Sequence, residues 1–163
     1  MQTLTKEQGL FELTLLNAET ARDRFDDLVV EGLGMGIPAE LMTRLQDLWE
    51  HTKVIAGEAV CFGKILVLRI FDFIKANRHL SIGLAIGAAL AALVACIPFL
   101  GPMLAPLIAT VSMIYGAAKG AARDSGDDSL GLYESVHLLA EKFFELLGVI
   151  FSSARDYFTK TEG

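Results

Sequence analysis

The longest feature of the hydrophobic pattern is an uncharged run over residues 80–118. Its length is about twice the roughly 20 apolar residues that a single membrane-spanning helix needs. The segment IPFLGP, residues 97–102, lies in its middle, where two prolines and a glycine interrupt a helix from either direction. The pattern therefore predicts two short antiparallel transmembrane helices, joined by a turn at Pro98, Gly101 and Pro102.

Before this run, the first part of the chain has the spacing of an amphipathic helix. The predicted helix extends from about Thr5 to about Glu31, and a capping box at Thr5 marks its start. Phe11, Leu15 and Leu28 recur at helical spacing and form its predicted apolar face. A glycine-rich stretch after Glu31 ends the helix as a turn, because it lacks the preceding strand and the Lys-Ser/Thr pair of a phosphate-binding loop.

Two further helices are predicted on either side of the uncharged run. One begins at Pro38 and continues unbroken to about residue 97, or else breaks near residues 77–79. The other covers about residues 130–158, and its apolar residues repeat every seventh position, which is typical of a coiled coil. The repeating residues are Tyr133, Val136, Ala140, Phe143, Leu147, Ile150, Ala154 and Tyr157.

Together these elements predict an all-α membrane protein in three parts. Residues 1–78 form amphipathic cytoplasmic helices, the second of which leads into the membrane, and residues 79–122 form the transmembrane helical hairpin. Residues 123–163 form an amphipathic helix that packs on the N-terminal helices and completes a cytoplasmic bundle. The alternative is a soluble bundle that hides the uncharged run until it is triggered, at the cost of burying that run within a small chain.

Composition and charge sharpen this picture. Hydrophobic residues make up 53% of the chain, and the excess lies in the uncharged run. Lys75 and Arg78 precede the run and Lys119 and Arg123 follow it, so the positive-inside rule predicts a multi-pass protein with both termini in the cytoplasm. The net charge of −6 argues against nucleic acid as a partner and makes the acidic outer helices the candidate surface for a protein partner.

Small residues recur at every fourth position within the uncharged run. Gly83, Gly87 and Ala91 form one such row, and Gly116 and Gly120 form a second pair. Rows of this kind let helices approach closely in lipid, as in a glycine zipper. They predict either association between copies of the chain, as a homo-oligomer, or closure of the hairpin within one chain.

Charged residues also interrupt the strongly apolar segment that precedes the hairpin. Lys64, Arg69, Asp72 and Lys75 lie close together on one side of the predicted helix. One interpretation is an interfacial helix whose charges meet the lipid headgroups. The other is a polar stripe that lines an aqueous path through an oligomer.

The sequence contains no recognisable catalytic or metal-binding motif, and we expect a protein that is not an enzyme and binds no cofactor. The histidines His51, His79 and His137 are far apart, and Glu134 with His137 forms only half of a di-iron motif. Both cysteines have apolar neighbours, which is typical of buried thiols.

The leading hypothesis is therefore an oligomeric, membrane-inserted protein that permeabilises or remodels the bilayer. In hydropathy, residues 80–118 are similar to the hydrophobic hairpin of pore-forming colicins and to the bilobed hydrophobic domain of chlamydial inclusion proteins. The likeness is confined to this run and assigns no functional residue. The alternative is a membrane-anchored adaptor whose acidic bundle recruits a protein partner.

Overall fold

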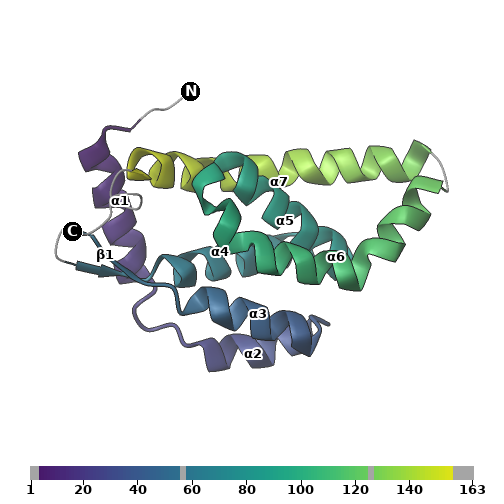
Figure 1. The fold of residues 1–163 in the computed structure, drawn as a ribbon, viewed down its shortest axis with the longest axis horizontal. Helices are drawn as coiled ribbons and strands as arrows, with labels where there is room; N and C mark the ends of the chain where they lie inside the picture. The colour runs from purple at the N-terminus through teal and green to yellow at the C-terminus, as the bar shows by residue number, and fades with distance from the viewer. Residues whose placement is uncertain (1–3, 56–57, 125–126, 156–163) are drawn as a thin grey trace.

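A computed structural model describes residues 4–55, 58–124 and 127–155 as seven α-helices, one 3-10 turn and a short β hairpin (Figure 1). The elements are α1 (Lys6–Glu19), α2 (Phe25–Gly34), α3 (Ala39–Trp49), β1 (Lys53–Ile55), β2 (Glu58–Val60), α4 (Phe62–Ala76), α5 (Ile82–Cys96), η1 (Pro98–Leu100), α6 (Gly101–Asp124) and α7 (Asp127–Ser153). The predicted all-helical character is confirmed, apart from this antiparallel hairpin, which pairs Lys53 with Val60.

The predicted start of the first helix is confirmed, and its predicted end near Glu31 is wrong. The Thr5 side chain accepts a hydrogen bond from the Gln8 amide at 3.1 Å, and the Gln8 side chain accepts one from the Thr5 amide at 2.9 Å. The helix ends at Glu19, and a polar turn separates it from α2. The apolar face was predicted only in part, since Leu28 is buried whereas Phe11 is 62% exposed, and Leu13 and Leu16 are the buried residues of α1.

The second helix is not continuous, so the prediction of an unbroken helix from Pro38 to residue 97 is wrong. The β hairpin interrupts it after α3, where Val54, Ile55 and Val60 favour strand over helix. The Asn17 side chain accepts a hydrogen bond from the Cys61 amide at 2.9 Å, which ties the end of this hairpin to α1.

The alternative break near residues 77–79 is confirmed. Asn77 is buried beyond the end of α4, and its side-chain amide donates to the carbonyl of Phe73 at 2.9 Å. Ser81 caps α5 by accepting a hydrogen bond from the Leu84 amide. The chain therefore changes direction between α4 and α5 instead of entering the hairpin as one long helix.

Helices α4 and α5 form the interior of the bundle. Helix α4 buries Ile70, Phe71 and Phe73, and it contacts α3, α5, α1 and α7. Helix α5 carries no charge and contacts α4, α6 and α7, with α7 providing its most extensive contact among the described elements (Figure 1). The fold therefore encloses the first half of the uncharged run with protein.

The predicted turn at 97–102 coincides with η1, which connects α5 to α6, and these two helices contact each other. Pro98 begins η1, and Gly101 and Pro102 begin α6. Helix α5 has 15 residues and is about 22 Å long at the usual rise, whereas the hydrocarbon core of a bilayer is about 30 Å thick. The compact structure thus contains a helical hairpin, but not two helices that each span a membrane.

The crossing of α3 and α4 yields a prediction about stability. The amide of Gly63 donates to the His51 carbonyl at 3.1 Å, and a β-carbon at Gly63 would collide with the Leu48 carbonyl oxygen. We expect Gly63→Ala to lower the free energy of unfolding by about 1–3 kcal/mol, because the two backbones must separate. Urea denaturation measures the change.

Gly34→Ala is the matched control, because nothing lies within 4 Å of a β-carbon at that position. Alanine also favours a helix more than glycine does, so the control is expected to be neutral or slightly stabilising. Equal stability of the two variants would contradict a close crossing at Gly63.

Candidate functional site

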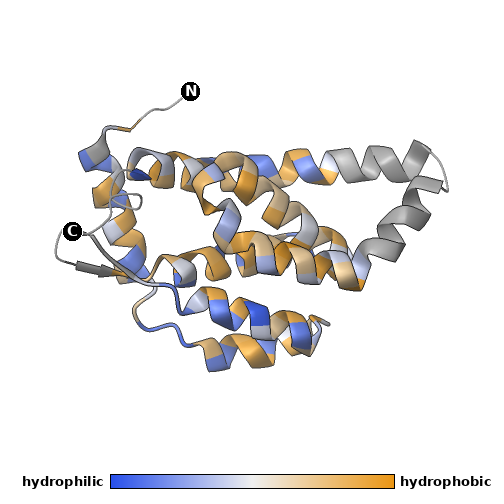
Figure 2. Cartoon of the chain, in the orientation of Figure 1, coloured by the Kyte–Doolittle hydropathy of each residue, from blue (hydrophilic) through white to orange (hydrophobic). Residues whose placement is uncertain are grey.

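Helix α6 carries an uncharged surface that is not enclosed by the bundle. Within the described chain, one helical segment is long and apolar enough to cross a membrane, residues Pro98–Tyr115, and only 28% of that segment is buried. Figure 2 shows apolar residues along α6 on its visible side. We call the exposed residues of this segment, which consists of η1 and the described start of α6, the outer face of α6. They are Pro98, Pro102, Ala105, Pro106, Ile108, Ala109, Ser112 and Met113.

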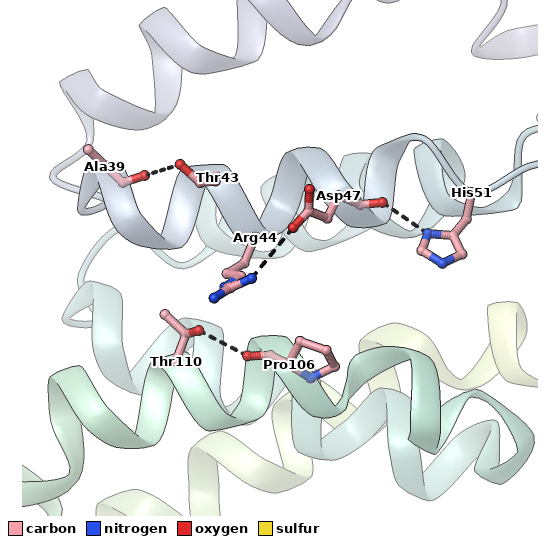
Figure 3. Close-up of polar contacts among 7 residues, drawn as sticks. All are labelled: Ala39, Thr43, Arg44, Asp47, His51, Pro106 and Thr110. Atoms are coloured by element: carbon pink, nitrogen blue, oxygen red, sulfur yellow. Dashed lines mark hydrogen bonds and ion pairs between the residues drawn. The ribbon is translucent and has the colours of Figure 1, made fainter.

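The opposite side of α6 packs on α3 and α5. Leu104, Leu107 and Val111 are buried there. Thr110 is buried among them, and its hydroxyl donates to the carbonyl of Pro106 at 2.9 Å, as Figure 3 shows. The polar group in the middle of this apolar helix is therefore satisfied within the helix, and it needs no partner from water.

A charged pair on α3 lies next to this part of α6. Figure 3 shows Arg44 pointing from α3 towards α6, with its guanidinium 3.7 Å from the carboxylate of Asp47. The pair is exposed, so it contributes at most about 1 kcal/mol to stability. Arg44 therefore points towards the side of α6 that packs on α3, and not towards its outer face.

The row of small residues on α5 faces α6 of the same chain at two positions. A β-carbon at Gly83 would meet the ring of Tyr115, and one at Gly87 would lie 4.0 Å from Val111 Cγ1. These contacts correspond to closure of the hairpin within one chain. A glycine zipper between chains and a coiled coil at α7 receive no support from the described residues, and the side-chain surroundings of Gly116 and Gly120 lie outside them.

The charged residues of α4 occupy two different places. Lys64 lies over the ring of Trp49, 5.4 Å from its centroid. Arg69, Asp72 and Lys75 instead line a cleft between α4 and the first two helices. The structure therefore brings three of the four predicted stripe residues together and separates Lys64 from them.

This cleft is acidic and has a volume of about 430 Å³. Leu16, Leu28 and Ile65 lie at its buried side, and Lys75 forms an ion pair of 3.4 Å with Glu31. Five carboxylates share the cleft with the two bases Arg69 and Lys75. They belong to Glu19, Asp23, Asp27, Glu31 and Asp72.

The sequence did not predict the cleft, because the cleft lies where the chain breaks between α1 and α2, and one continuous helix was predicted there. A signal was present, since Glu19, Asp23, Asp27 and Glu31 recur at every fourth residue. Across residues 4–55, 58–124 and 127–155, no group of three or more side chains is arranged to hold a metal ion. With five carboxylates against two bases, the lining of the cleft carries a net negative charge.

Comparison with known proteins gives no match to a family model, to a curated protein or to a solved structure.

A prediction follows from the position of Pro106 inside α6. Proline has no amide hydrogen, so it leaves the carbonyl of Pro102 without its usual helical partner. Because Pro106 is exposed, Pro106→Ala has room for its side chain and restores this hydrogen bond. We expect the free energy of unfolding to rise by about 1–3 kcal/mol in urea denaturation.

Pro102→Ala serves as the control, because Pro102 is also exposed and is the second residue of α6, a position in the first turn where a helix tolerates proline. Its effect is expected to be close to zero. A Pro106→Ala variant no more stable than the control would contradict the proposed backbone penalty.

Proposed function

We propose that this protein is a membrane-active helical bundle that inserts its α5–α6 hairpin into a bilayer and, as an oligomer, permeabilises or remodels it. The outer face of α6 is the observation that carries this proposal. A long uncharged face on the surface of a helix long enough to cross a bilayer suits lipid better than water. The multi-pass membrane location with both termini in the cytoplasm is part of the same proposal.

The two helices of the hairpin contribute in different ways. At the usual rise, the 18 residues Pro98–Tyr115 are about 27 Å long, close to the thickness of the hydrocarbon core. Helix α5 is shorter and enclosed, so it leaves its protein contacts when the hairpin inserts. Before insertion, the bundle would keep the hairpin packed against protein in a water-soluble form. The proposal thus combines the membrane-inserted protein with the alternative of a soluble bundle that hides the uncharged run until it is triggered.

The proposal makes a prediction about the outer face of α6. Met113 is 77% exposed, so Met113→Glu leaves the folded bundle intact. A charged side chain inside the hydrocarbon costs about 2.5–3.5 kcal/mol at the centre of a span and less towards its end. We therefore expect Met113→Glu to reduce dye release from anionic liposomes by about tenfold.

Val30→Glu is the matched control, because Val30 is 76% exposed and lies on α2, away from the hairpin. It introduces the same charge at the same exposure. The proposal predicts dye release close to that of the unmodified chain. Equal dye release from both variants, or no release from the unmodified chain at any protein concentration, would overturn the proposed membrane activity.

The second candidate function is a membrane-anchored adaptor, and the acidic cleft favours it. The carboxylates of the cleft are complementary to basic side chains, and its apolar side is complementary to an apolar face, so the cleft suits a basic, amphipathic segment of a protein partner. In this case the hairpin serves as an anchor. The adaptor predicts that the protein binds liposomes without releasing dye, whereas the leading proposal predicts binding and release together.

A further inference from the structure

The contact between α5 and α7 is close as well as extensive. Gly148 of α7 lies against the end of α5, and a β-carbon there would be 2.7 Å from Cys96 Cβ and 3.3 Å from the Cys96 carbonyl oxygen. On α5, Ala85, Ala88 and Ala89 are buried. Small side chains on both helices therefore let their backbones approach without intervening bulk.

Helix α7 is also attached to other parts of the bundle. Phe143 and Phe144 lie against Phe73 of α4, with ring centroids 5.3 and 5.8 Å away. Near its C-terminal end, Ser153 and the backbone of Ile150 lie next to Gly9 of α1. Contacts with α4 and α1, and not only those with α5, therefore keep α7 in its place along α5.

Helix α7 is amphipathic, with an apolar side that is buried and a charged side that is exposed. Ala140, Leu147 and Phe151 are buried, whereas Glu141 and Glu145 are exposed. Helix α5 has no charged residue, so lipid could replace α7 around it. Helix α7 carries charged residues and is not suited to lipid in the same way. Lipid and α7 thus compete for the same apolar surface of α5.

We infer that α7 is an autoinhibitory strap, which retains α5 in the bundle and must separate from it before the hairpin enters a bilayer. This inference rests on the proposed membrane activity and adds its regulation. It places the barrier to insertion at the α5–α7 contact near Cys96 and Gly148. Weakening that contact accelerates insertion, and fixing it prevents insertion.

One variant weakens the strap. Gly148→Ala places a methyl group against Cys96, while alanine favours the helical conformation of α7 itself. We expect the rate of dye release from anionic liposomes to rise at least about fivefold, a change that corresponds to a modest weakening of the contact. Gly34→Ala is the control for the same substitution at an open position. Circular dichroism verifies that both variants retain their helices.

A second variant fixes the strap in place. The Ser152 hydroxyl lies 3.4 Å from the Cys96 carbonyl oxygen, so Ser152→Cys places a thiol beside the backbone of Cys96, and mass spectrometry verifies the disulfide before release is measured. In a Cys61→Ser background, these two are the only thiols, and their oxidation links α7 to α5. We expect the oxidised protein to release dye at least about tenfold more slowly, with full recovery after reduction.

The outcomes separate the two proposals. Slow release when oxidised and fast release when reduced supports the strap, as does faster release by Gly148→Ala. Rapid release by the reduced protein with equal release by the oxidised protein would overturn the strap and leave the membrane activity standing. No release by any of the proteins, including the unmodified chain, would overturn the membrane activity and the strap with it.

Discussion

The burial of α5 is the constraint on which the rest of the structure depends. A helix without any charged residue has no side suited to water, so the chain must surround it. Helices α4, α6 and α7 provide that cover, and the three are themselves held by α1 and α3. In a chain of 163 residues, three of the seven described helices are thus committed to covering this one. This leaves the outer face of α6 uncovered.

The start of the first helix and the turn of the hairpin could be predicted because their signals are local. Thr5 with Gln8 forms a capping box whatever the fold, and Pro98 with Gly101 interrupts a helix in any surroundings. The break before Phe25 could not be predicted in this way, since the apolar spacing continues across it. The side of α1 that faces the core depends on α7 and α4, which no local pattern specifies.

The candidate site was predicted in part for a similar reason. Absence of charge marks both a buried helix and a membrane span, so sequence alone did not distinguish α5, in which seven of 15 residues are buried, from the segment Pro98–Tyr115, of which only 28% is buried. Of the predicted stripe on α4, Arg69, Asp72 and Lys75 line one cleft, as their helical spacing allows. The placement of Lys64 over Trp49 depends on how α3 crosses α4, and this crossing lies beyond the reach of spacing arguments.

The distribution of charge connects the fold with the proposed activity. Seven charged groups line the acidic cleft between α4 and the first two helices. The described part of the hairpin up to Tyr115 has none. Moving the hairpin from protein to lipid therefore breaks no ion pair within it, and Thr110 keeps its hydrogen bond to Pro106 in either surroundings. In the proposed insertion, the contacts that α5 leaves are mostly apolar and belong chiefly to α7, so the balance between bundle and bilayer would depend on how firmly α7 is attached.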